Sequence, residues 1–459
     1  MMNQSSLHRW LSIARQLAFA YLLLAASRLR AADVPAGFTP LFNDRDLSGW
    51  RGGITYDPRQ LRELPDAERH AKIAAWTAAL TKRNDKTGKP HWRVVDGELV
   101  NDGSGGYVTT EKDYGDFELR LEYKMAPQAD AGIYLRGIPQ VQIGNPARPD
   151  PQNAGLAKGS GGLWNNPPGS PGRDQLVLAD RPPGEWNRVR ILMLGSRVSV
   201  WLNDRLVVDH AILENYFDRE LPPERRRPIP ARGPIQLQTH GGEIRWRNPS
   251  LREIGSDEAG DMLARRGVAG YQFIFNGRDL ADWAGAVDAV EIKDRVLVWR
   301  KGKGGNTLYW NRELKDFQAR VRFKIPPGGN NGLAIRYPGT GLAAYDGMCE
   351  LQIYDDSDER TKTMDPRQAH GSAYGMAAAV RGYQHPPGEW NFQEVTVRGS
   401  RLTVELNGTV ILDADLGRVD PATMMNKRPH VGRTRTSGFF GFAGHSDPVM
   451  FKDIMIKQL

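Results

Sequence analysis

The chain has 459 residues, 40% of them hydrophobic and 25% charged, which predicts two or three globular domains with sizeable cores. Its net charge of +8 comes from scattered Lys and Arg with one short run at residues 225–227, a distribution that disfavours nucleic-acid binding. The single cysteine, Cys349, excludes an intrachain disulfide, and the counts of 50 Gly and 30 Pro suit short strands joined by tight turns.

The N-terminus has the pattern of a secretory signal. Arg9 and Arg15 precede an apolar run from Leu17 to Ala26, which has the length of a signal-peptide core and is too short to span a bilayer. We expect residues 1–32 to be a signal peptide, and the mature protein to be periplasmic or secreted without stable membrane insertion. An uncleaved anchor is the alternative, disfavoured because no further apolar residues extend the run.

The rest of the chain repeats itself. FTPLFNDRDLSGW is matched by YQFIFNGRDLADW, DFELRLEYK by DFQARVRFK, and GSRVSVWLN by GSRLTVELN, while PPGEWN occurs twice. Later motifs are separated by a nearly constant 200 to 205 positions, so the copies are collinear. This predicts a first domain at 33–256, a linker near 255–267 and a second domain at 268–459.

The first copy contains an insertion. Trp50 and Trp283, which end the opening motif of each copy, are 233 positions apart, more than the later motifs. Between about 57 and 88 the Leu and Ala residues recur at helical spacing, Pro58 and Pro65 suit the first turn of a helix, and Gly88 suits a stop. We expect a helical insertion at the rim of the first domain.

Each copy otherwise alternates apolar and polar residues. Phe117, Leu119 and Leu121 alternate with Glu118 and Arg120, a period of two that marks strands with one buried face. Tight-turn sequences separate consecutive apolar strands. Many short strands at this spacing predict an all-β protein of two antiparallel sandwiches or jelly rolls.

Polar residues recur on the opposite face of three strands in each copy. A solvated outer face explains the polar residues of any one strand. The same polar pattern on three strands in two copies favours a carbohydrate-binding groove, because Arg, Gln, Tyr and His side chains hydrogen-bond hydroxyls directionally. Trp164 and Tyr374, in Gly- and Pro-rich loops, could stack on sugar rings, although each alone is more often a packing aromatic. The stripe consists of Arg336, Glu350, Gln352, Tyr354 and His445 in the second copy, and of Arg136, Gln140, Gln142, Gln236, Gln238 and His240 in the first.

Carboxylates are scarce on this stripe. Ordinary glycoside hydrolysis needs two of them, yet the second copy offers Glu350 alone and the first copy none, since Gln140 takes the matching place. A single base with an Arg or metal electrophile would suffice to remove a proton α to a carbonyl. No GxSxG motif is present. The acidic turn at 355–358 is typical of a solvated loop, with a calcium site as the minor alternative.

At these motifs the chain resembles the 3-keto-disaccharide hydrolase family. The matching segments include LFNDRDLSGW, WRVVDGELV, GDFELRLEYK, AGIYLRG and GPIQLQTHGG in the first copy, and IFNGRDLADW, CELQI and GFFGFAGH in the second. The resemblance covers nearly all of the mature chain. It implies two tandem concanavalin-like jelly-roll domains that cleave glycosides oxidised at C3, by hydrolysis or by elimination.

Carried over by position, the resemblance implies Glu350 as base or metal ligand, His445 as acid/base, and Arg336 with Gln352 as contacts to the sugar or its ketone. Tyr354 and Tyr374 complete the expected second site. The first copy keeps Arg136, Gln142 and His240 as expected substrate contacts, but Gln140 puts its catalysis in doubt. Trp164, from its loop, is added as an expected stacking contact. A non-catalytic carbohydrate-binding pair and a surface interaction protein are the rival hypotheses. The sequence requires no cofactor, and a divalent cation stays an open alternative.

Overall fold

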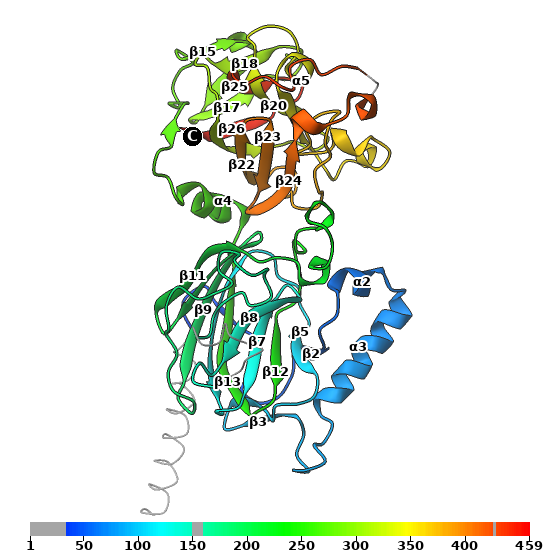
Figure 1. Ribbon diagram of the computed structural model, residues 1–459, viewed down its shortest axis with the longest axis vertical. Helices are drawn as coiled ribbons and strands as arrows, with labels where there is room; N and C mark the ends of the chain where they lie inside the picture. Colours follow the sequence, from blue (N-terminus) through cyan, green and yellow to red (C-terminus); the bar gives the residue numbers. More distant parts are fainter. Residues whose placement is uncertain (1–33, 149–158, 426–427) are drawn as a thin grey trace, which may run out of the picture.

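The computed structural model describes residues 34–148, 159–425 and 428–459. These residues form two β-sandwich domains that follow one another along the chain (Figure 1). The predicted all-β tandem sandwich is therefore confirmed. The predicted signal peptide lies outside the described residues. Within the described ranges, no helix is long and apolar enough to cross a membrane.

The first domain packs a large antiparallel sheet against a smaller one. The large sheet has the order β11 (Arg205–Ile212), β10 (Arg197–Leu202), β9 (Asn187–Leu194), β6 (Phe117–Met125), β13 (Ile244–Glu253), β4 (Glu98–Asn101), β3 (Trp92–Val95), with β1 (Thr39–Pro40) also paired to β13. The small sheet has the order β2 (Trp50–Gly53), β5 (Tyr107–Thr110), β12 (Gln236–His240), β7 (Asp130–Leu135), β8 (Ile138–Gly144).

The second domain repeats this topology strand for strand. Its large sheet runs β24 (Thr409–Asp415), β23 (Arg401–Leu406), β22 (Trp390–Arg398), β19 (Phe317–Lys324), β26 (Met450–Gln458), β17 (Val296–Trp299), β16 (Val290–Lys293), with β14 (Gln272–Phe273) paired to β26. Its small sheet runs β15 (Trp283–Gly285), β18 (Thr307–Trp310), β25 (Phe439–Ala443), β20 (Asn330–Tyr337), β21 (Cys349–Tyr354).

Four α-helices and several short 3-10 turns complete the described residues. The α-helices are α2 (Pro58–Glu63), α3 (Asp66–Leu80), α4 (Ser256–Arg265) and α5 (Ala343–Asp346). The 3-10 turns are η2 (Tyr216–Asp218), η3 (Pro223–Arg225), η4 (Val287–Ala289), η5 (Glu359–Lys362), η6 (Pro366–Gln368), η7 (Leu416–Arg418) and η8 (Pro421–Thr423).

Each core lies between the two sheets of its domain and follows the period-two pattern of the sequence. On β6 the alternating apolar residues from Phe117 to Tyr123 are at most 3% exposed, and on β19 those from Phe317 to Phe323 are at most 1% exposed. Burial of such a side chain contributes about 1.5–3 kcal/mol. Cys349 joins the second core and is completely buried.

The insertion of the first copy forms α2 and α3 beside β2, at the edge of the first domain (Figure 1). Asp57 caps the N-terminus of α2, where its side chain accepts a hydrogen bond from the backbone N–H of Arg59. A Cβ at Gly52 would lie 2.1 Å from the backbone of Trp76, so only glycine allows this contact between α3 and β2. The helix ends at Leu80, in the core, whereas Gly88 occupies a later turn with φ of +65°.

The predicted linker is mostly helical, because α4 has an apolar face that packs on β22. Leu263 belongs to a small cluster with Phe392 of the second domain and Leu194 of the first. On its acidic side, Asp257 and Asp261 bind Arg322, whose side chain is 1% exposed.

Direct contacts also join the two domains. Arg197 of β10 forms an ion pair with Glu405 of β23. The Tyr383 hydroxyl donates a hydrogen bond to the carbonyl of Ile229 at 2.9 Å. A Cβ on Gly408 would lie 2.4 Å from the carbonyl oxygen of Leu194, so the backbones approach closely there. These contacts fix one domain against the other.

Candidate active site

One face of the small sheet in the second domain opens into a pocket. Gly332 on β20 pairs with Gln352 on β21 and with Ala443 on β25, and directly paired residues project from the same face of a sheet. The pocket has a volume of about 310 Å³. Five of the predicted residues line it: Glu350, Gln352, Tyr354, Tyr374 and His445.

Glu350 is the centre of the polar contacts in this pocket. Its Oε1 accepts a hydrogen bond from Gln352 Nε2 at 3.0 Å and lies 3.2 Å from His445 Nε2. Glu350 is 8% exposed. A Cβ at Gly332 would lie 2.4 Å from Glu350 Cγ, so the glycine on the neighbouring strand makes room for the carboxylate. The sequence thus positions one carboxylate beside one imidazole.

The electrostatics of the pair favour a charged imidazole. Burial opposes the charge on His445, but the hydrogen bond and the attraction to Glu350, with a further contribution from Asp447, outweigh it and raise the pKa of His445 above its ordinary value of 6.5. A protonated His445 can donate a proton to a leaving group while Glu350 remains available as a base.

The opposing effects of burial and of the Glu350 charge on the pKa of His445 can be tested by titration. In Glu350→Gln the burial of His445 remains but the carboxylate charge is lost, so the pKa of His445 is expected to fall below its wild-type value. An NMR titration of the His445 imidazole in the wild-type protein and in Glu350→Gln measures both pKa values. Because the wild-type pKa is raised, the pair stabilises the fold fully below about pH 6.5, and this contribution disappears as pH rises through the folded pKa. An unchanged pKa in the variant would contradict the pairing.

A segment specific to the second copy closes one side of the pocket. Glu350 follows Arg336 by 14 positions, whereas Gln140 follows Arg136 by 4, and the additional residues include α5. Buried His430 holds this wall by donating from Nδ1 to the carbonyl of Ala344 at 2.7 Å. The rings of Tyr345 and Tyr374 meet edge to face, with centroids 6.1 Å apart.

Sequence reasoning missed several residues that line the pocket. The unequal spacing between the copies was the available signal for the α5 wall and its Tyr345. The others belong to loops or strand ends that the motif comparison did not include. They are Asn306, Thr307, Asn330 and Gln368.

Arg336 does not line the pocket, which corrects its predicted catalytic role. Its guanidinium is 1% exposed and donates to the carbonyls of Lys315, Gly399 and Arg435 at 2.6–2.8 Å, and to Asp316 Oδ1 at 2.8 Å. With all these acceptors around it, the guanidinium ties the small sheet to the large sheet and cannot reach a sugar.

Arg136 makes the same kind of contact in the first domain, so its predicted substrate contact is also wrong. It is 1% exposed and donates to the carbonyls of Gly115 and Pro230 and to Asp116 Oδ1. The recurrence of this arginine in the two copies therefore reflects a shared structural clamp.

The other predicted residues of the first domain are only partly brought together. Gln140 and Gln142 lie side by side on β8, and the Gln140 amide donates to Gln142. His240 ends β12 and is exposed. Trp164 is covered by the guanidinium of Arg173, whose Cζ lies 4.2 Å from the ring centroid. This contact gives Trp164 a packing partner within its own loop.

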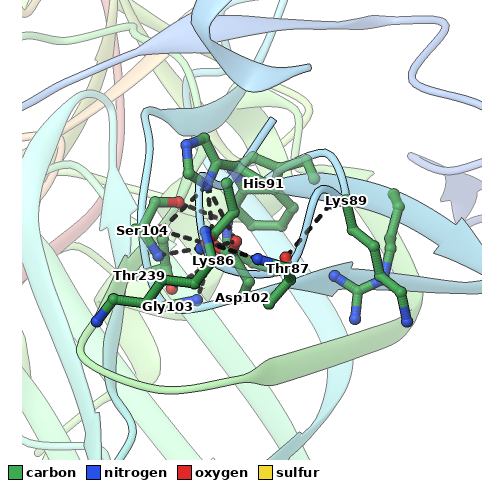
Figure 2. Close-up of polar contacts among 12 residues, drawn as sticks. Lys86, Thr87, Lys89, His91, Asp102, Gly103, Ser104 and Thr239 are labelled. Carbon is green, nitrogen blue, oxygen red and sulfur yellow. Dashed lines mark hydrogen bonds and ion pairs between the residues drawn. The ribbon is translucent and has the colours of Figure 1, made fainter. Parts of the chain in front are cut away.

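A Ser-His-Asp cluster lies beside β3 and β4 of the first domain, in the residues just before β3 and just after β4, and its contacts are shown in Figure 2. The carboxylate of Asp102 lies 3.0 Å from His91 Nδ1, and Ser104 Oγ lies 3.0 Å from the same nitrogen. In a hydrolytic triad the serine contacts the opposite ring nitrogen from the aspartate. Ser104 also donates to Asp102 at 2.8 Å, so the cluster is a loop network and not a nucleophilic triad.

The acidic turn after β21 is held by contacts within its own loop and with the turn between β19 and β20. Asp355 accepts from the backbone N–H of Gly328 at 2.8 Å, Asp358 pairs with Arg360, and burial raises the pKa of Asp356 to about 6. Among the described residues, no group of three or more His, Cys, Asp and Glu side chains is placed to hold a metal ion.

The fold and the pocket define a class of protein: tandem jelly-roll sandwiches in which one sheet face carries a carboxylate and a histidine. The family model of the 3-keto-alpha-glucoside-1,2-lyase-like domain matches residues 37–252 and again residues 270–457. The chain belongs to this family.

Individual relatives are more distant. A 3-keto-disaccharide hydrolase of Bacteroides thetaiotaomicron is 24% identical over 228 residues, which are 41% of this chain and 79% of the relative. A solved structure from Parabacteroides distasonis, of a protein proposed to be a glycosyl hydrolase, is 26% identical with a TM-score of 0.37, and covers 41% of this chain and 94% of its own. The carbohydrate-binding module CBM66 of Bacillus subtilis is 14% identical with a TM-score of 0.27, over 39% of this chain and 97% of the module.

Proposed function

We propose that the second domain cleaves glycosides that carry a ketone at C3, by a mechanism with one base. The observation that carries this proposal is the pairing of Glu350 with His445 in a pocket of about 310 Å³. A ketone at C3 acidifies the proton on C2, so loss of the C1 substituent needs a base and a proton donor, and not two carboxylates.

The proposed step balances with the groups present. Glu350 takes the C2 proton, the C–H electron pair becomes the C1–C2 double bond, and the C1–O bond breaks with its electrons passing to the leaving oxygen. Protonated His445 gives its proton to that oxygen. The products are an unsaturated 3-keto sugar and the free aglycone. Addition of water across the double bond in a later step would make the net reaction a hydrolysis.

The surrounding polar groups support sugar binding. Gln352 fixes the carboxylate, while Tyr354 and Asn330 face the same pocket and can hydrogen-bond hydroxyls. Tyr374 and Tyr345 supply ring surfaces in the wall. We also propose export through the segment 1–32, which the N-terminal sequence of protein recovered from cells would test.

A paired assay tests the function. The full mature protein is incubated with a 3-keto-glucoside and, separately, with the same glucoside unoxidised at C3. Release of aglycone from the oxidised substrate alone is expected, and the ultraviolet absorbance of an enone would identify elimination. Equal cleavage of the two substrates would contradict the single-base mechanism. Binding of the oxidised sugar without turnover would favour the non-catalytic carbohydrate-binding alternative.

A further inference from the structure

The small sheet of the first domain carries a carboxylate, Asp130, on the face equivalent to the one that holds Glu350 in the second domain. Asp130 begins β7, where it pairs directly with His240 of β12. Gly132, two residues along the same strand, pairs with Gln142 of β8. Because paired residues share a face and side chains alternate along a strand, Asp130, His240, Gln142 and Gln140 all project from one side of the small sheet.

Among the described residues, the strands of each small sheet contain one carboxylate, and the two copies hold it at different positions of the same site. Asp130 occupies the place of Asn330, since each begins the equivalent strand, and Asn330 lines the pocket of the second domain. Gln140 occupies the place of Glu350, because Gly132 and Gly332 make room for the side chain at this position in the two domains. The acid and the amide have thus exchanged strands between the two domains. The histidine and the second glutamine, Gln142 or Gln352, keep their positions.

In both domains the equivalent glutamine donates its hydrogen bond to the carboxylate, although the carboxylate lies on different strands. Gln352 Nε2 donates to Glu350 in the second domain, and Gln142 Nε2 donates to Asp130 Oδ1 at 2.6 Å in the first. The Gln140 amide in turn donates to Gln142, so three side chains form a chain that ends on the acid. In each domain the equivalent glutamine therefore orients the one carboxylate on the face.

The surroundings of Asp130 suit a base. Burial raises its pKa, against the opposing effects of the hydrogen bond from Gln142 and of the charges that face it, His240 from β12 and Arg148 from the segment after β8. Gln238, also on β12, pairs with Gly132 and has a buried amide oxygen without a hydrogen-bond partner among the described residues, which leaves an acceptor on the same face as the acid.

We propose that the first domain is a second proton-transfer site for 3-keto-glycosides, in which Asp130 takes the C2 proton and His240 protonates the leaving oxygen. The inference rests on the proposed function of the second domain and extends its chemistry to the first. Bonds form and break as in the second domain, with Asp130 replacing Glu350. Gln142 is the positioning residue.

The test compares variants of the full chain on one 3-keto-glucoside. Glu350→Gln should leave a residual rate that comes from the first domain. Adding Asp130→Asn should lower that residual rate by about 10² or more, since a positioned base contributes about 10²–10⁴. Adding Gln140→Glu to this double variant should restore the residual rate, because it recreates in the first domain the Asn and Glu arrangement of the second.

Asp130→Asn keeps an oxygen that can accept from Gln142, and thermal unfolding verifies that the fold is intact. Asp113→Asn, at an exposed aspartate of the same domain, is the matched control and should leave the residual rate unchanged. The proposal is overturned if Glu350→Gln has no residual rate, if Asp130→Asn leaves that rate unchanged, or if Gln140→Glu fails to restore it in a folded protein. A wild-type protein inactive on 3-keto-glycosides would instead refute the proposed function itself.

Discussion

Glu350→Gln is expected to lower kcat on a 3-keto-glucoside by about 10²–10⁴ while the protein stays folded. An amide cannot take up a proton at neutral pH, so the variant loses the proposed base of the second domain. Its carbonyl oxygen can still accept from Gln352, which lies 3.0 Å away in the wild-type pocket, so the packing of the face is preserved. Steady-state kinetics and a melting curve on the same preparation distinguish loss of the base from loss of folding.

The equivalent position of the first domain supplies the control. Gln140 is already an amide, so Gln140→Ala should leave most turnover intact, apart from an effect on binding in that domain. Full activity of Glu350→Gln together with loss of activity in His240→Ala would reverse the assignment and make the first domain the main catalyst. If neither Glu350→Gln nor His240→Ala changed the turnover of any sugar, carbohydrate binding without catalysis would be the better description.

The fold could be predicted because its signals are local and repeated. Alternation along β6 and β19 reports directly on which side chains reach the core, and two copies of each motif reduce the chance of a false match. The linker was harder, since α4 gains its packing surface only from residues distant in sequence, such as Phe392 and Leu194.

The site was predicted where strands are regular and missed where they are not. Glu350 and Gln352 lie on an uninterrupted strand, so parity places them on the open face. Arg336 has φ of +47° and lies where the pairing of β20 with β25 shifts register, so counting residues from Leu333 gives the wrong direction for its side chain. Asp130 was missed because the comparison searched for a carboxylate only at the position of Glu350.

The second large effect concerns stability. Arg336→Met should destabilise the second domain by about 3 kcal/mol, because the buried guanidinium loses four hydrogen bonds and each contributes about 0.5–1.5 kcal/mol net. For a domain of this size that corresponds to a decrease of about 6–12 °C in the melting temperature of the second domain, measurable by scanning calorimetry.

Arg401→Met is the control for loss of an arginine. Arg401 is 61% exposed and pairs with Asp413 at the surface, so its replacement should cost no more than about 1 kcal/mol. Below its melting transition, Arg336→Met should retain wild-type kcat on a 3-keto-glucoside, because the guanidinium lies outside the pocket. Loss of turnover with an unchanged melting temperature would place Arg336 in the chemistry after all. Loss of stability with turnover retained would establish that this arginine, repeated in the two domains, holds the sheet whose open face carries the site.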